Sequence, residues 1–237
     1  MITAQLQTMS RGHNFRAHAL RSGSMAPFLG VDHAWMSAPT FPMHQHVGLS
    51  AVSYVFEDTQ TPINNQDSLG NHNLIHAGGL HWAAAGRGIR HQEDPLEIGK
   101  TVHQLQIFVD LADEKKSDAP FVLSLDAKDI PVVKQNGVRV RVPLGSYGSA
   151  HSPLTPPTEV NLFDISLDDG AVLIVPIAAG HNAFVMPIVG TVTINGAIFE
   201  SNQSAIPIFA AQNEAHTIEL HTQHGKAQIV VFSGAPI

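Results

Sequence analysis

Short apolar runs, separated by turn residues about every 8 to 12 positions, recur along the whole chain. They are rich in β-branched residues or alternate apolar with polar positions, and they cover 49–56, 102–111, 138–142, 171–177, 183–194 and 228–232. Runs of this length between Gly, Pro, Asn and Asp are typical of β-strands. Few windows have a helical period, and the charged segment 110–118 is interpreted as a solvated loop or a short helical turn. The pattern predicts an all-β protein.

A weak internal repeat indicates two similar halves. The segment 50–58 reads like the segment 182–190, 132 positions later, and each is followed by a polar turn. Two antiparallel double-sheet barrels side by side would accommodate the predicted strands and close their own sheet edges. We therefore predict an N-terminal domain over 1–130 and a C-terminal domain over 131–237.

Composition excludes several classes of function. The chain has 237 residues, and its 20 acidic against 13 basic side chains give a net charge of -7, which argues against direct binding of nucleic acid. It has no cysteine, so disulfides and thiolate chemistry are excluded and any metal must be held by nitrogen and oxygen. No apolar run is long enough for a secretion signal or a membrane span, and we expect a cytoplasmic protein without membrane contact.

Two short clusters, 44–46 (HQH) and 91–93 (HQE), form a candidate metal site. Side chains two positions apart on a strand point to the same face, so His44 and His46 can reach one ion. The same spacing adds His91 and Glu93. Three imidazoles and one carboxylate suit a first-row transition ion such as Fe, Mn, Ni, Cu or Zn, and they suit Ca or Mg poorly. A four-ligand set of this kind leaves coordination positions open, as catalytic metals require.

The repeat predicts that only one half carries the metal. Under the offset of the repeat, His44 falls on Pro176 and His46 on Ala178, and neither residue can be a ligand. The second cluster corresponds roughly to 216–218, which keeps one histidine and loses the carboxylate. We expect a single ion, held by the first half.

The chain resembles the pirin family of the cupin superfamily. The matching segments of the first half are 41–46, 52–57, 67–71 and above all 85–93, AGRGIRHQE; those of the second half are 180–185 and 191–196. The resemblance implies two cupin barrels, with the metal in the N-terminal one only. It also implies a metal-dependent dioxygenase of the bacterial pirin type, which opens the heterocycle of a flavonol such as quercetin with O2 and releases carbon monoxide.

In that scheme one divalent ion, with Fe(II) favoured over Mn, Ni, Cu and Zn, receives the 3-hydroxyl oxygen of the flavonol. Glu93 is assigned two tasks, as a ligand and as the catalytic base that accepts the substrate proton. The resemblance supports an alternative from another class as well, because pirins include regulators. This alternative is a metal-dependent regulatory or sensor protein without turnover, acting through protein partners.

Four further residues are candidates for contact with the substrate. His81 occupies a position that lies near the metal pocket in the family, where it could hydrogen-bond a ligand or be simply packed. Arg87 could anchor a ligand or be a solvated surface residue. Met43 and Phe56 are expected to line the barrel interior.

The chain also departs from the family pattern. Members often carry HPHRGFE where this chain has HQHVGLS over 44–50, so an arginine, an aromatic ring and a carboxylate are missing. The family usually has glutamine where His81 stands. We expect the metal site to survive these changes and the shape and charge of the pocket to differ.

Overall fold

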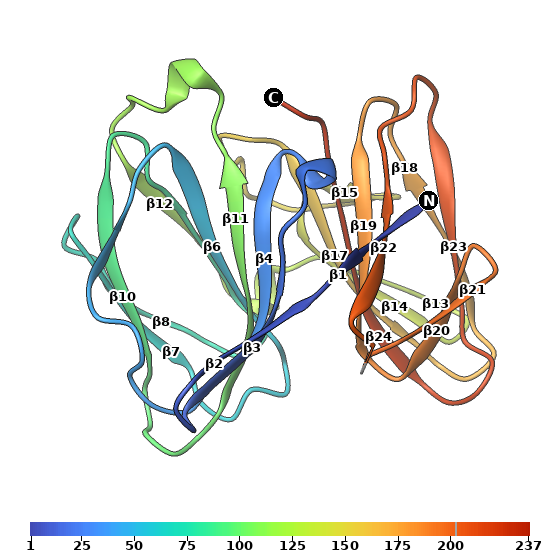
Figure 1. The fold of residues 1–237 in the computed structure, drawn as a ribbon, viewed down its shortest axis with the longest axis horizontal. Coiled ribbons are helices and arrows are strands. Elements are labelled where there is room, and N and C mark those ends of the chain that lie inside the picture. Colours follow the sequence, from blue (N-terminus) through green and yellow to red (C-terminus); the bar gives the residue numbers. More distant parts are fainter. Residues whose placement is uncertain (202) are drawn as a thin grey trace.

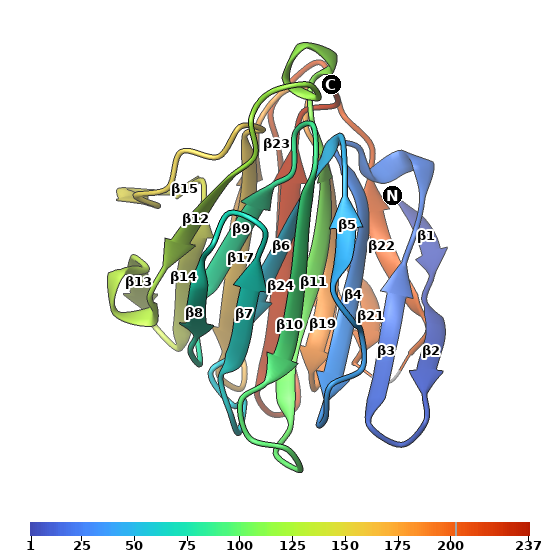
Figure 2. The same ribbon diagram turned by 90° about the vertical axis from the view of Figure 1, so that its left-hand side faces the viewer.

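The first half of the protein is a sandwich of two antiparallel sheets. The computed structural model describes residues 1–201 and 203–237. The larger sheet has seven strands, in the order β12 (Phe121–Leu125), β9 (Leu80–Ala84), β6 (Leu49–Val55), β11 (Val102–Asp110), β4 (Phe28–Met36), β3 (Phe15–Leu20) and β2 (Gln7–Arg11). The smaller sheet has four, in the order β5 (His44–His46), β10 (Ile89–Pro95), β7 (Ile63–Asp67) and β8 (His72–Ile75). It faces the viewer in Figure 2.

The second half repeats this arrangement. Its seven-stranded sheet has the order β1 (Ile2–Gln5), β22 (Ala205–Phe209), β19 (Asn182–Val189), β24 (Ala227–Gly234), β17 (Val160–Leu167), β14 (Val138–Leu144) and β13 (Val132–Gln135). Its four-stranded sheet has the order β18 (Val172–Ile177), β23 (His216–His221), β20 (Thr191–Ile194) and β21 (Ala197–Glu200). A small hairpin joins β15 (Ser146–Tyr147) to β16 (Ala150–His151).

The all-β prediction is confirmed. Within the described residues, the helical elements are the short 3-10 turns η1 (Gly23–Met25), η2 (Asp113–Lys115) and η3 (Ala127–Asp129). The second of these is the helical turn expected in 110–118. None of the described helices is long and apolar enough to cross a bilayer.

Two sequence expectations about the strands differ from the structure. The run 183–194 is interrupted at Gly190, so it forms two strands that belong to different sheets of the second half. The first strand of the chain, β1, pairs with β22 in the sheet of the second half, with Ile2 opposite Ile208. The predicted domain boundary between 130 and 131 falls between η3 and β13. Although β1 lies within the predicted N-terminal domain, it belongs to the sheet of the second half.

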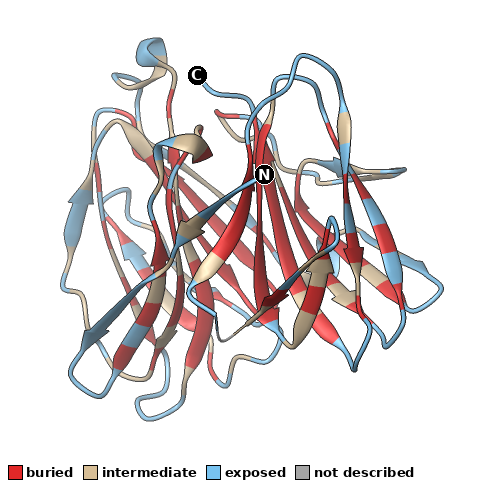
Figure 3. Cartoon of the chain, turned by 45° about the vertical axis from the view of Figure 1, so that its right-hand side comes forward, coloured by how far each residue is buried: buried red, intermediate tan, exposed pale blue. Residues whose placement is uncertain are grey.

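The two seven-stranded sheets pack against each other, and the main core lies between them (Figure 1). Val52 and Leu105 contribute from the first half, and Phe184 and Phe232 from the second. Their two phenyl rings stack with centroids 4.4 Å apart. Buried positions run along the strands on both sides of this contact in Figure 3. The large apolar faces therefore join the halves into one body.

A buried polar network also ties the halves together. Arg141 on β14 is 1% exposed, and its guanidinium donates to the hydroxyl oxygen of Tyr54 on β6 and to the carbonyl oxygen of Gly78, 2.7 Å away. The hydroxyl of Tyr54 donates in turn to Asp164 on β17 at 2.6 Å. Gln228 donates to the other oxygen of the same carboxylate. Arg141 and Asp164, the two charged groups of this network, thus each have hydrogen-bond partners.

The interiors of the two sandwiches differ in chemistry. Inside the second, one continuous apolar cluster extends from Val138 to Val231. Inside the first, the apolar contacts break into three small clusters. Between these clusters the inward positions carry buried polar residues, among them Ser53, Asn65, His91, Glu93 and Gln104. Since buried polar groups are costly unless they have partners or a task, the first sandwich is where a functional site is expected.

Candidate metal centre

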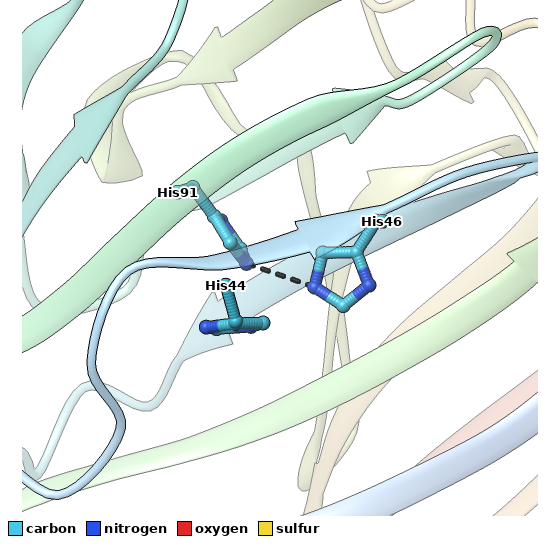
Figure 4. A group of neighbouring side chains, drawn as sticks. All are labelled: His44, His46 and His91. Atoms are coloured by element: carbon cyan, nitrogen blue, oxygen red, sulfur yellow. Dashed lines mark hydrogen bonds between the residues drawn. The ribbon is translucent and has the colours of Figure 1, made fainter.

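Three histidines converge at the rim of the first sandwich, as Figure 4 shows, with His91 buried, His46 half-buried and His44 exposed. His44 and His46 lie on β5, and alternation along the strand turns both rings to one side. His91 on β10 lies directly opposite His44 in the pairing of these strands. One ring nitrogen from each histidine lies within 4.8 Å of those of the other two. The structure therefore brings together three of the four predicted ligands.

The fourth predicted ligand, Glu93, lies beside this cluster. It is on β10, two positions after His91, and its Oε1 is 3.9 Å from Nδ1 of that histidine. Its Oε2 accepts a hydrogen bond of 2.6 Å from the hydroxyl of Ser53 on β6. The side chain is 8% exposed. Burial raises the pKa of Glu93, while nearby His81 and the hydrogen bond from Ser53 oppose this shift.

The donor set fits a transition metal. Nε2 of His46 and Nε2 of His91 lie 3.0 Å apart, so two atoms able to carry lone pairs face each other. Nδ1 of His91 is buried without a hydrogen-bond partner among the described residues. Burial, together with the neighbouring histidines, lowers the pKa of both His46 and His91 to about 4. Both imidazoles are therefore neutral near pH 7, as metal ligands must be.

The lowered pKa values predict a pH dependence for the metal-free protein. An unfolded histidine titrates near 6.5, whereas His46 and His91 titrate at about 4 in the folded chain. Between these pH values the unfolded state binds more protons, so stability is complete above pH 6.5 and falls as the pH is lowered toward 4. We expect the urea midpoint of the metal-free protein to be lower at pH 5 than at pH 7. The difference should shrink in His46→Ala; an equal difference in that variant would contradict the assignment.

A cavity of about 140 Å³ opens beside the histidines. Its lining includes the three histidines and Glu93. The remaining wall combines apolar side chains with polar residues of β4 and β11: Met9, Phe15, Asp32, Ala34, Met36, Phe41, Gln104, Gln106 and Phe108. A small molecule in this cavity would contact the metal ligands directly.

The four residues predicted to contact substrate lie elsewhere. Phe56 is fully buried on the side of the sheet that faces the other half, where its ring packs 4.4 Å from that of His103. Arg87 is exposed in the turn before β10, and Met43 is half-buried just before β5. The described residues that line the cavity include neither these three nor His81. Their contact with substrate stays a prediction.

His81 is a buried neighbour of the site that interacts electrostatically with Glu93. It is 2% exposed on β9, opposite Ser53 in the strand pairing, and its Nδ1 shares a hydrogen bond of 2.9 Å with the hydroxyl of Ser124. Its Nε2 is buried without a partner among the described residues. Burial lowers the pKa of His81, and the charge of Glu93 opposes that shift. His81 is therefore close enough to interact electrostatically with the carboxylate of Glu93.

The sequence reasoning did not single out the polar cavity residues of β4 and β11. Gln104, Gln106 and Phe108 alternate along β11, and Asp32 is opposite Gln106 on β4. The signal was present in the predicted strand 102–111, where two glutamines occupy the face opposite Leu105 and Ile107. Polar residues on an inward face mark a cavity, but the sequence alone does not say which face is inward.

The glycine-rich turn before β10 positions His91. Gly86 has φ of 49°, and a Cβ atom there would lie 2.3 Å from the carbonyl oxygen of Asp118. The next residue, Arg87, donates its backbone N–H to the same oxygen. The turn thus holds the start of β10 against the segment after η2, and only glycine fits at this point.

We expect Gly86→Ala to lower the free energy of unfolding by about 1–3 kcal/mol, because it adds backbone strain and a steric clash. Gly12→Ala is a matched control, since Gly12 has φ of 58° and open space around its Cα. Urea unfolding of both variants measures the two costs. An equal loss in the two variants would show that the contact with Asp118 contributes nothing.

The second sandwich has no comparable site among its described residues. Within the described part of the chain, the group of three or more converging donors is that of His44, His46 and His91. Pro176 and Ala178 stand at the equivalent positions, and the interior is filled by apolar side chains. That a metal is held by the first half alone stays a prediction.

The chain is all-β and forms two double-sheet barrels. The first carries the group of imidazoles, and the second has an apolar core. This is the architecture of a bicupin. A family model described as Pirin matches residues 4–109. Pirin-like protein 2 of Arabidopsis thaliana is 32% identical over 244 aligned positions, which cover 100% of this chain and 74% of that protein. The chain belongs to the pirin family.

Other comparisons agree with this assignment. A putative quercetin 2,3-dioxygenase of Pseudomonas aeruginosa is 26% identical over 89% of this chain and 76% of its own length. Among solved structures, a Geobacillus kaustophilus protein superposes with a TM-score of 0.89 at 26% identity, covering 99% of this chain and 95% of that one. A bacterial pirin of Escherichia coli in complex with nickel(II) shares the fold, with a TM-score of 0.76 at 20% identity over 100% and 99% of the two chains.

Proposed function

We propose that this pirin is a metal-dependent dioxygenase that opens the heterocycle of a flavonol with O2. The observation that carries the proposal is the group of His44, His46 and His91, with Glu93 beside it, at the wall of a cavity that a small molecule can enter. The similarity to a putative quercetin 2,3-dioxygenase supports the reaction class.

His44, His46 and His91 would hold one divalent first-row ion, with Glu93 as the further ligand. When bound, such an ion supplies Lewis acidity toward an oxygen of the substrate and a means of electron exchange with O2. Fe(II) is the favoured ion, and Mn, Ni, Cu and Zn are the alternatives. The nickel(II) complex of the Escherichia coli pirin supports a transition metal in this fold.

Glu93 is the base in this proposal. Ser53 donates to Oε2, while Oε1 accepts no hydrogen bond from the described residues, so one oxygen is available for a proton. The raised pKa of Glu93 makes its carboxylate a stronger base than an exposed one, and Glu93 would accept the proton of the flavonol hydroxyl. The hydrogen bond from Ser53 would hold the carboxylate in place, and Phe15, Phe41 and Phe108 in the cavity lining would limit access of water.

The test is oxygen consumption with quercetin under Fe(II), Mn(II), Ni(II) and Cu(II) in turn. We expect decay of the flavonol absorbance, with carbon monoxide as a product, only with metal present and not in His46→Ala. His72→Ala is a matched control, since His72 is exposed on β8. A flavonol that binds but does not react with any of these ions present would refute the proposed dioxygenase activity and favour the metal-dependent regulator.

A further inference from the structure

One wall of the cavity carries a hydrogen-bond acceptor that the protein itself leaves unused. Gln104 is 5% exposed, and its Oε1 is buried without a hydrogen-bond partner among the described residues. Gln106, two positions along the same face of β11, also lines the cavity, but its Oε1 already has the hydroxyl of Ser53 as a partner at 3.1 Å. A buried polar atom without a partner is costly, so such an atom at a cavity wall indicates a ligand that supplies the missing hydrogen.

Asp32 extends this acceptor wall on the next strand. It pairs with Gln106 across β4 and β11, and its carboxylate lines the cavity. Nη1 of Arg21 lies 2.6 Å from its Oδ1 and compensates the charge. Arg21 reaches this position by crossing Gly30, where a Cβ atom would lie 2.6 Å from its Nε. The ion pair is therefore built into the wall, and a carboxylate there favours a ligand that donates hydrogen bonds.

The other side chains around the cavity suit an aromatic ring. Phe15 and Phe41 meet edge to face with centroids 5.0 Å apart, and Phe108 lies 5.8 Å from the ring of His46. Met36 completes the apolar part of the lining. Flat apolar surfaces with a few placed polar groups are the usual composition of a site for a small aromatic ligand.

The size of the cavity limits the ligand further. At about 140 Å³ it has the volume of one six-membered ring, because an engineered cavity of about 150 Å³ is known to take up benzene. A flavonol carries a fused bicycle and a pendant ring, which together exceed this space. A flavonol could therefore place only one of its rings inside.

We infer that the acceptor wall of Asp32 and Gln104 recognises the hydroxyl groups of a single hydroxylated aromatic ring, of the catechol type, seated in the cavity beside the histidines. This rests on the proposed function for the placement of substrate at the metal, and it deepens that function by naming the chemistry of the ring that enters. The ring is either a free monocyclic phenol or one ring of a larger flavonol.

The experiment compares catechol with 1,2-difluorobenzene, which has nearly the same shape and no hydrogen to donate. Dissociation constants are measured anaerobically by calorimetry on the zinc-loaded full chain, since zinc has no redox chemistry. We expect catechol to bind at least about tenfold more tightly, and Gln104→Met to remove about tenfold of this preference. Gln66→Leu, at an exposed glutamine of β7, is the matched control and should change nothing.

A preference that survives both Gln104→Met and Asp32→Asn would come from the ion and would overturn the inference, as would equal binding of the two probes. Thermal melts establish that each variant is folded, and Asp32→Asn carries the comparison should Gln104→Met fail to fold. Displacement of catechol by quercetin identifies the flavonol ring as occupant; catechol binding without displacement identifies a free phenol. Quercetin turnover without catechol binding would refute this inference alone, and catechol binding without turnover would refute only the dioxygenase.

Discussion

In the His91→Ala variant we expect the bound transition metal to fall from about one ion per chain to below about 0.1, with at least a hundredfold loss of flavonol turnover. His91 is the ligand that joins the two strands of the site, because it lies opposite His44 and its Nε2 is 3.0 Å from Nε2 of His46. Without it, the ion would keep only the two imidazoles of β5 and the carboxylate of Glu93. Metal content by mass spectrometry and oxygen uptake measure the two losses.

The variant should remain folded, because the removed ring is part of a polar cluster and not of the apolar core. The control is His103→Gln, at a buried histidine 6% exposed whose Nδ1 hydrogen-bonds Asp58 on the other face of the large sheet. It should keep the metal. Retention of a full ion by His91→Ala would place the metal elsewhere and end the assignment of this site.

In the Arg141→Ala variant we expect the free energy of unfolding to fall by about 3–5 kcal/mol, which lowers the melting temperature by roughly 10 °C. The substitution removes the guanidinium that donates a hydrogen bond to the hydroxyl oxygen of Tyr54. It leaves the buried carboxylate of Asp164, 2% exposed, without its counter-charge. It also leaves the carbonyl oxygen of Gly78 without its donor. Differential scanning calorimetry measures the loss.

Lys134→Ala is the control for this variant, since Lys134 is a basic residue exposed on the neighbouring strand β13. Its melting temperature should change by less than about 2 °C. The double variant Arg141→Met with Asp164→Leu should recover much of the stability, because both charges are then replaced by apolar groups. A single Arg141→Ala variant as stable as the Lys134→Ala control would show that the network contributes nothing to the union of the halves.

The strands and the histidine cluster could be predicted because their signals are local. A period of two in HQH and HQE is enough to place His44 with His46 and His91 with Glu93 on common faces, and the structure adds that β5 and β10 are neighbours. The runs 102–111 and 228–232 appear as β11 and β24 with small shifts at their ends. Alternation is a property of a short segment, so no knowledge of the rest of the chain is required.

The features that were missed depend on contacts between distant segments. The sequences of β1 and β22 give no local signal that the two strands pair. The sequence of β11 likewise does not show which of its faces lies inside the sandwich. The placement of Phe56 illustrates the same difficulty. It follows Tyr54 on the face that meets the second half, and nothing near it in the sequence separates that face from the interior.

The exchange of β1 into the partner sheet has a consequence for the order of assembly. β1 precedes every other described strand in sequence, yet Ile2 pairs with Ile208 on β22, so almost all of the other strands lie between the two partners. Contacts so far apart in sequence form slowly, because a very long loop must close to make them. We therefore expect the pairing of β1 with β22 to form late in folding, so that the backbone edge of β22 stays unpaired until then.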